Sequence, residues 1–205
     1  YFRRTFTLAA APREANVQCG ADTRYRLYIN GVFAGFGPAR GALAEPAYDT
    51  YPIAHLLRPG KNVIAFHVHA FGKVERCSSF IPIRGGLIAA IRIDGQAPIL
   101  TDASWKTVRE TAYRSDTPRH SNHQGYVECF DARLARRGWA EPAFDDSGWT
   151  AAVPLGRTRD LPPWKRLVPR AVPFLTRDPR LPARIVETGR IIFPDGLDPS
   201  NLAHL

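Results

Sequence analysis

The stretch YRLYINGVFAGF, residues 25–36, decides the fold. In its first half, Tyr25, Leu27 and Ile29 alternate with other residues, and this period of two is typical of a strand that is buried on one face. Asn30-Gly31 then separates the first run from a second apolar run. Because a type I′ turn needs positive φ at both central residues, this pair predicts a β-hairpin.

The same pattern recurs outward from the hairpin. We expect strands at residues 62–70, at 88–93 and 98–100 joined by Asp94-Gly95, at 105–108 and at 126–130, and a short helix at 53–57. Pro59-Gly60 is a further turn signal. Short strands at this spacing predict an all-β fold, an antiparallel β-sandwich or jelly roll.

The chain changes character near residue 155. Prolines at positions 162, 163, 169, 173, 179 and 182 should break any regular element. We therefore expect a sandwich domain at residues 1–154, a proline-rich connector at 155–183, and the first strands of a following domain at 184–205. Trp164 lies in the connector, and we expect it to dock on another domain.

Composition excludes several classes of function. The formal charge is +9, but only four of the 28 basic residues are lysines, and the arginines are scattered rather than clustered, so we predict no nucleic-acid partner. No apolar run approaches the about 20 residues of a membrane span.

The three cysteines (Cys19, Cys77 and Cys129) allow at most one disulfide. The sequence holds no Met and opens at Tyr1 without a signal peptide, which favours a piece of a longer protein and leaves its location open between cytoplasmic and secreted.

Several segments carry a family resemblance when they are taken in order. They are residues 1–6 (YFRRTF), 21–31 (ADTRYRLYING), 37–41 (GPARG), 48–51 (YDTY), 57–65 (LRPGKNVIA), 69–72 (HAFG), 130–133 (FDAR), 138–139 (GW) and 144–149 (FDDSGW). Together they resemble the N-terminal β-sandwich region of bacterial α-L-rhamnosidases of glycoside hydrolase family 78. That region is similar to the galactose-binding-like jelly-roll domains of β-galactosidases.

The resemblance implies a glycoside hydrolase whose catalytic acids lie in an (α/α)6 barrel, and this chain is too short to hold one. Hydrolysis generally needs two carboxylates about 5–10 Å apart. Asp145-Asp146 is an acidic pair, but we interpret it as a turn with an Asx hydrogen bond. We assign no catalytic residue and no cofactor. The chain is expected to be non-catalytic and to pack on the catalytic domain of the same polypeptide.

A carbohydrate site combines an aromatic face with polar side chains that hold hydroxyls. The loop at 37–41, the segment at 48–51 and the strand end at His69 are expected to converge at one end of the sandwich. Arg40 and Asp49 are the candidate hydroxyl partners, Tyr48 or Tyr51 is the candidate platform, and a rhamnose- or galactose-containing glycan is the expected ligand. The alternative is that Arg40 and Asp49 form an ion pair while the tyrosines fill the core.

Metal binding is a weaker interpretation. His67 and His69 share one strand face, and His120 and His123 would complete a zinc site only if their loop folded back, so we interpret the first two as surface histidines. Calcium occurs in some sugar-binding relatives of this fold, and Asp22, Asn30 and Asp49 would be its ligands here. Two other functions stay open, an independent carbohydrate-binding module and a purely structural interaction domain.

Overall fold

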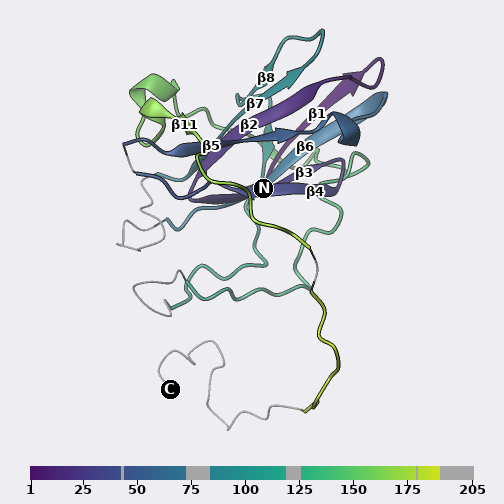
Figure 1. Ribbon diagram of the computed structural model, residues 1–205, viewed down its shortest axis with the longest axis vertical. Coiled ribbons are helices and arrows are strands. Elements are labelled where there is room, and N and C mark those ends of the chain that lie inside the picture. Colours follow the sequence, from purple (N-terminus) through teal and green to yellow (C-terminus); the bar gives the residue numbers. More distant parts are fainter. Residues whose placement is uncertain (43, 73–83, 119–125, 179, 190–205) are drawn as a thin grey trace.

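The computed structural model describes residues 1–42, 44–72, 84–118, 126–178 and 180–189. It contains two β-sheets that face each other, so the predicted all-β sandwich is confirmed (Figure 1). One sheet has the order β10-β9-β1-β6-β3-β4 and the other β11-β5-β2-β7-β8. Within the described residues, no helix is long and apolar enough to cross a membrane.

The strands are short, as the spacing of turns predicted. Their bounds are β1 Phe2–Leu8, β2 Ala15–Asp22, β3 Arg24–Ile29, β4 Val32–Gly37, β5 Ala47–Pro52, β6 Gly60–His69, β7 Gly86–Ile93, β8 Ile99–Leu100, β9 Lys106–Thr107, β10 Thr150–Ala151 and β11 Val168–Pro169. Three 3₁₀ turns accompany them, η1 Ala54–Leu56, η2 Thr158–Asp160 and η3 Trp164–Arg166. The expected short helix near residue 55 is therefore a single 3₁₀ turn.

The hairpin of β3 and β4 forms as expected. Asn30 and Gly31 have φ values of 51° and 85°, the left-handed conformation that the turn requires. Asn30 also acts beyond the turn, because its side-chain oxygen accepts the Val63 N–H at 2.9 Å and its amide donates to the Leu56 carbonyl at 2.9 Å. The turn residue thus connects the hairpin to β6 and to the 3₁₀ turn η1.

The core lies between the two sheets. Val17 and Ile91 from one sheet and Leu27 and Phe66 from the other are completely buried there. Each of them comes from a strand whose alternate residues face outward, which is the pattern of a sheet with one buried face. His67 accordingly points away from the core, as predicted for its strand face.

The outer face of the six-stranded sheet is partly covered by the segment after residue 130. Trp139 stacks on Tyr1, with ring centroids 4.0 Å apart and planes within 2°. Below it, Arg3 is 1% exposed, and its Nε donates to the Asp146 carboxylate at 2.8 Å. The part of this face that contains His67 and His69 lines a groove.

The connector departs from the prediction that its prolines exclude regular structure. β11 pairs in parallel with β5, because the N–H groups of Val168 and Arg170, on either side of Pro169, donate to the carbonyls of Pro46 and Tyr48. A proline at this edge position therefore removes no hydrogen bond from the ladder.

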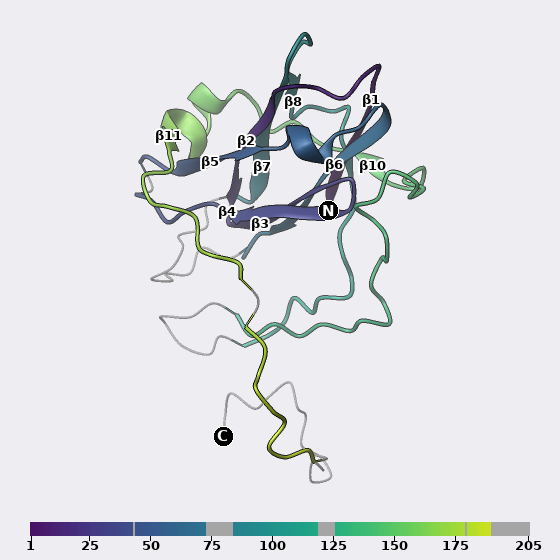
Figure 2. The same ribbon diagram turned by 45° about the vertical axis from the view of Figure 1, so that its right-hand side comes forward.

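Trp164 is also placed differently from the prediction. It is 6% exposed and packs inside this chain, so close to Gly86 that a Cβ there would lie 2.7 Å from the indole ring. The connector then passes from β5 to β4, where the Arg177 guanidinium donates to the Ala34 carbonyl at 3.1 Å (Figures 1 and 2).

Two expected strands differ in the structure. Residues 126–130 form no strand, and the segment is paired through isolated contacts, such as the bridge between Phe130 and Tyr113 and the hydrogen bond from the Val127 N–H to the Pro118 carbonyl. Residues 184–189 are likewise unpaired, and residues 190–193 lie outside the described part of the chain. A following domain stays a prediction.

Candidate functional site

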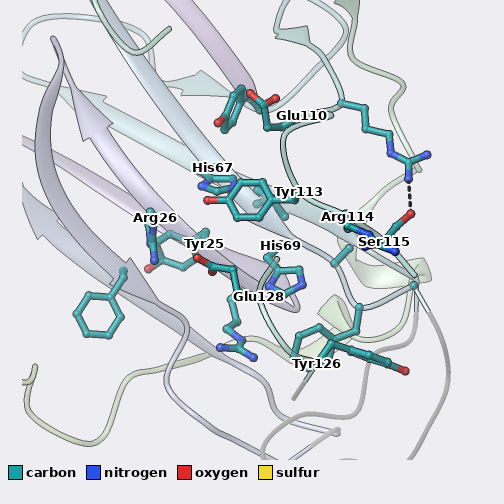
Figure 3. Close-up of a pocket in the computed structure, with 18 of the residues that line it drawn as sticks. Tyr25, Arg26, His67, His69, Glu110, Tyr113, Arg114, Ser115, Tyr126 and Glu128 are labelled. Atoms are coloured by element: carbon teal, nitrogen blue, oxygen red, sulfur yellow. Dashed lines mark hydrogen bonds between the residues drawn. The ribbon is translucent and has the colours of Figure 1, made fainter. Parts of the chain in front are cut away.

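A groove of about 1450 Å³ lies on the outer face of the six-stranded sheet (Figure 3). Its floor comes from β3, β4 and β6, and its wall from the chain around residues 109–117 and 126–129. Figure 2 shows the segment of this wall projecting from the sandwich below β3 and β4.

Strand register places the side chains of the floor. Arg26 in β3 pairs with His67 in β6 on one side and with Phe36 in β4 on the other. Cross-strand partners share a face, so these three side chains form a row across the sheet. Their neighbours Tyr25 and Leu27 point into the core, which leaves the row to the groove.

An irregularity in the hairpin brings two phenylalanines to the same face. The register shifts between Leu27 and Tyr28, so that Tyr28 pairs with Phe33 while Arg26 pairs with Phe36. Residues three apart in a regular strand point to opposite faces, but the extra residue of a bulge reverses the alternation. The rings of Phe33 and Phe36 therefore lie side by side, 6.5 Å apart and within 8° of parallel, and both are about 40% exposed (39% and 41%).

The wall is held in place by Glu110. This carboxylate is 9% exposed and accepts the N–H of Ala112 at 2.9 Å and that of Arg136 at 3.4 Å. Burial acts to raise the pKa of Glu110, but the two backbone hydrogen bonds, a hydrogen bond from Tyr1 and the charge of Arg136 together outweigh it, so that the pKa is lowered. Both carboxylate oxygens of Glu110 thus accept hydrogen bonds from the backbone of the wall and of the segment at Arg136.

Aromatic contacts join the wall to the floor. The Tyr113 ring lies 5.3 Å from His67 and 4.6 Å from Phe130, and His69 packs edge-on to Phe71 at 4.9 Å. Burial lowers the pKa of His67 to about 4 and also lowers that of His69, with Arg24 as the next cause for His69. At neutral pH both imidazoles are therefore uncharged and can each donate and accept a hydrogen bond.

Two charged side chains in the groove keep their hydrogen-bonding groups available. Arg26 and Glu128 are exposed and, among the residues that the structure describes, neither forms a hydrogen bond or an ion pair. Figure 3 shows both among the side chains that surround the hollow, together with His69 and Tyr113. The groove thus combines aromatic faces with hydrogen-bonding groups that have no partner in the described residues. Such an arrangement is suited to binding a ring that carries polar substituents.

Comparison with known proteins identifies the family. The model of the α-L-rhamnosidase N-terminal domain matches residues 10–169 of the chain. The chain belongs to this family. The resemblance expected from the sequence is therefore confirmed.

Solved structures agree with this assignment. The α-L-rhamnosidase N-terminal domain described here superposes on a family 78 rhamnosidase of Bacillus sp. GL1 with a TM-score of 0.78 and 43% identity, covering 84% of this chain and 18% of that one. An α-L-rhamnosidase of Streptomyces avermitilis is 28% identical over 123 residues, which are 56% of this chain and 11% of that protein. A lectin of Pleurotus ostreatus matches with a TM-score of 0.50 and 28% identity, over 76% of this chain and 35% of the lectin. The chain thus spans less than a fifth of the length of the two rhamnosidases.

Of the five residues predicted to bind carbohydrate in this N-terminal domain, only His69 lines the groove. Tyr48 is half-buried in β5, next to β11, and Arg40 is exposed in the chain between β4 and β5. Asp49 and Tyr51 lie in the interior. The structure does not bring the five together.

Asp49 forms a buried ion pair, and its partner is Arg170. The Arg170 Nε donates to the fully buried carboxylate at 2.6 Å, and the Tyr25 hydroxyl donates to its other oxygen. Tyr51 belongs to the core cluster, and its hydroxyl donates to the Phe36 carbonyl at 2.8 Å. These contacts give Asp49 and Tyr51 a structural role in the rhamnosidase N-terminal domain.

The sequence interpretation missed the residues that line the groove opposite His69. Arg26 alternates with Tyr25 and Leu27, which puts it on the outer face of its strand, and an aromatic at the paired position of the other hairpin strand is the signal that would have pointed to Phe36. Phe33 could not be found in this way, because its orientation depends on the bulge. Glu128 lies in a segment that was expected to form a strand, and Tyr113 lies in none of the expected elements.

The three residues expected to bind calcium do not fit one site. Asp22 and Asn30 flank β3 (Arg24–Ile29) at its opposite ends, and a strand of this length separates its ends by about 20 Å. The Asp22 carboxylate accepts the N–H groups of Arg84 and Gly85, while Asn30 is bonded to β6. Among the described residues, no three His, Cys, Asp or Glu side chains are grouped to hold a metal ion. His120 and His123 lie outside the described residues, and so does Cys77, whereas Cys19 and Cys129 are free thiols.

The acidic pair Asp145-Asp146 has two separate roles in this domain. The Asp145 carboxylate accepts the Ser147 N–H at 2.9 Å, which is the predicted Asx turn. Asp146 points elsewhere and pairs with the buried Arg3.

Proposed function

We propose that this domain binds carbohydrate in the groove and serves, without cleaving bonds itself, the catalytic domain of an α-L-rhamnosidase. The observation that carries the proposal is the juxtaposition of Phe36, with its exposed ring, and two side chains with unspent hydrogen-bonding groups, Arg26 and Glu128. Aromatic rings stack on the C–H faces of sugars, and charged side chains hold hydroxyls. The likeness to a fungal lectin supports the same function.

The non-catalytic part of the proposal rests on the acids of the groove. Glycoside hydrolysis generally uses two carboxylates that face the scissile bond. Two glutamates line the groove, and the carboxylate of Glu110 is already occupied by backbone N–H groups. Among the described residues of the lining, Glu128 is the acid whose oxygens accept no hydrogen bond, which is enough to hold a hydroxyl but does not make a hydrolytic pair.

Calorimetric titration of the chain with L-rhamnose and with α-L-rhamnosides tests binding. We expect millimolar or tighter dissociation constants, and at least a fivefold loss in the Phe36→Ala variant. Leu100→Ala is the matched control, because Leu100 is an exposed apolar residue, 53% exposed, on the other sheet. Absence of heat with every sugar, or equal losses in both variants, would contradict the proposal.

Incubation with an aryl α-L-rhamnoside tests the second part. We expect no release of the aryl alcohol by the purified chain. Turnover that disappears in a Glu128→Gln variant would show that the domain is catalytic.

A second role is packing on the rest of the polypeptide, and the tail of the described chain favours it. Its apolar side chains are highly exposed, namely Val172, Leu175, Leu181, Ile185 and Val186. Single monomers rarely leave such a row uncovered. In the full-length enzyme, Leu181→Asp should lower the melting temperature of the catalytic domain, whereas Leu100→Asp should not; equal effects of the two substitutions would argue against this contact.

A further inference from the structure

The charges around the groove point to a particular class of sugar. Among the residues that the structure describes, five arginines and two glutamates line it, namely Arg24, Arg26, Arg109, Arg114 and Arg177, and Glu110 and Glu128. Because His67 and His69 are uncharged at neutral pH, the positive charge of the described lining comes from its arginines. Among the described residues of the lining, the arginines therefore outnumber the glutamates by three.

The two sides of the groove use their charges differently. On the wall, Arg114 forms a two-point ion pair with Asp116, with both N–O distances 3.0 Å. Arg109 donates to the Ser115 hydroxyl at 3.2 Å, the hydrogen bond that Figure 3 marks with a dashed line. Both glutamates also belong to the wall. The charge of Arg114 is thus paired with that of Asp116, whereas Arg109, like Arg177 on the floor, uses one nitrogen for a neutral acceptor.

On the floor, two guanidinium groups border the phenylalanine pair. Arg26 is the cross-strand partner of Phe36, and it has no hydrogen bond or ion pair within the described part of the chain. The Arg177 guanidinium lies over the ring of Phe33 at 5.3 Å and uses one nitrogen for the Ala34 carbonyl. Since a guanidinium has five N–H donors, most of the donors of Arg26 and Arg177 have no hydrogen-bond partner among the described residues.

We propose that the groove selects a sugar that carries a carboxylate, a uronic acid, within a rhamnose-containing glycan. The sugar ring stacks on Phe36, and its carboxylate accepts hydrogen bonds from Arg26 and Arg177. Guanidinium and carboxylate match in shape as well as charge, and such hydrogen bonds are about twice as strong as neutral ones. The inference rests on the proposed function, since it names the class of carbohydrate that the same groove binds.

A matched pair of ligands tests the inference on the 205-residue chain. The first is a disaccharide of L-rhamnose and D-glucuronic acid, and the second is its methyl ester, which keeps the ring and removes the charge. We expect the acid to bind at least tenfold more tightly than the ester in calorimetric titrations at low salt. Because exposed charges are screened by salt, the preference should shrink at high salt while binding of the ester changes little.

Substitutions in the groove then test which residues cause the preference for the acid over the ester. Arg26→Gln and Arg177→Gln should each reduce binding of the acid by about five- to tenfold and leave binding of the ester within twofold. Arg92→Gln is the matched control, because Arg92 is an exposed arginine on the other sheet, where it contacts Gln18. Thermal unfolding of each variant checks that the fold is retained.

The outcomes separate the two proposals. Equal affinity for acid and ester, or a preference that survives both substitutions, would overturn the inference and leave the carbohydrate-binding function standing. Binding of neither ligand, nor of L-rhamnose, would overturn the function and the inference together.

Discussion

At the scale of single residues, Arg3 shows how a charge is accommodated under the loop that covers the sheet. Its side chain lies on the outer face of β1, where the rings of Phe144 and Trp149 are 5.1 and 5.9 Å from its guanidinium carbon. It donates to Asp146 and to the carbonyls of Trp139 and Glu141. One buried cation thus ties the segment around residues 139–149 to the sheet.

Removing this cation should be costly. Arg3→Ala leaves two backbone carbonyls and a carboxylate without their donor, and we expect a loss of about 2–4 kcal/mol in the free energy of unfolding. Urea denaturation followed by tryptophan fluorescence measures it. The exposed Arg13 is the control, and Arg13→Ala should change stability by less than about 0.5 kcal/mol. Similar values for the two variants would contradict the structural role of Arg3.

His67 should make stability depend on pH. Its pKa is lowered from 6.5 to about 4 by burial, so the unfolded chain takes up a proton at a higher pH than the folded one. The contribution is fully present above about pH 6.5 and is lost as the pH falls from there towards 4, by about 2 kcal/mol for a partly buried ring.

Denaturation curves between pH 7 and 4.5 test this dependence. His67→Gln should flatten the pH profile of stability, because the titrating group is gone. His55→Gln should leave the profile unchanged, because His55 is exposed on the 3₁₀ turn η1. Identical profiles for wild type and His67→Gln would show that other groups carry the effect.

At the scale of elements, the β3–β4 hairpin supplies both the floor and the aromatic face of the groove. Its turn is fixed by the positive φ of Asn30 and Gly31, and its bulge turns Phe33 to the side of Phe36. The site therefore depends on the register of one hairpin. A change in the turn that shifts the pairing of β3 with β4 should therefore also move the side chains that line the groove.

Gly31→Ala is the substitution that tests the turn. A side chain at φ 85° is strained, and its Cβ would lie 3.1 Å from Glu141, so we expect a loss of about 1–2 kcal/mol in stability. Gly148→Ala is the control, since a Cβ there meets nothing within 4 Å. Chemical denaturation of both variants measures the difference, and a neutral Gly31→Ala would indicate that the turn can rearrange.

At the scale of the whole molecule, the connector is part of the sandwich. It adds β11 to one sheet, buries Trp164 against Gly86, and reaches the other sheet at Ala34. Arg170 within it neutralises Asp49, which is completely buried. The folded unit thus extends beyond residue 154.

Two truncations test this boundary. A chain that ends at residue 154 loses Trp164 and leaves the Asp49 carboxylate buried without its cation, so we expect it to lose about 3–5 kcal/mol or to fail to fold. A chain that ends at residue 178 keeps these contacts and should melt within a few degrees of the 205-residue chain. Equal melting temperatures for the two truncations would show that the connector only lies on the surface.

Local pattern determined most of the architecture. Alternation within residues 25–29 and the Asn-Gly pair were enough to predict the hairpin, because side-chain direction along a strand repeats every two residues and the turn conformation is a property of two residues. The ordered motifs were enough to predict the family. The prediction that the prolines of the connector exclude strands was wrong, because a proline's effect depends on whether a partner edge needs its N–H.

Only the tertiary structure decided the groove. Phe33 joins Phe36 through a bulge that no period of two reveals, and Tyr113 meets His67 across 46 residues of sequence. Asp49 forms its ion pair with Arg170, which lies 121 residues later in the chain, and not with Arg40, which is closer in sequence. Such pairings depend on which sheet edges and loops meet when the core forms. The local sequence pattern does not show which residues far apart in the chain will come into contact.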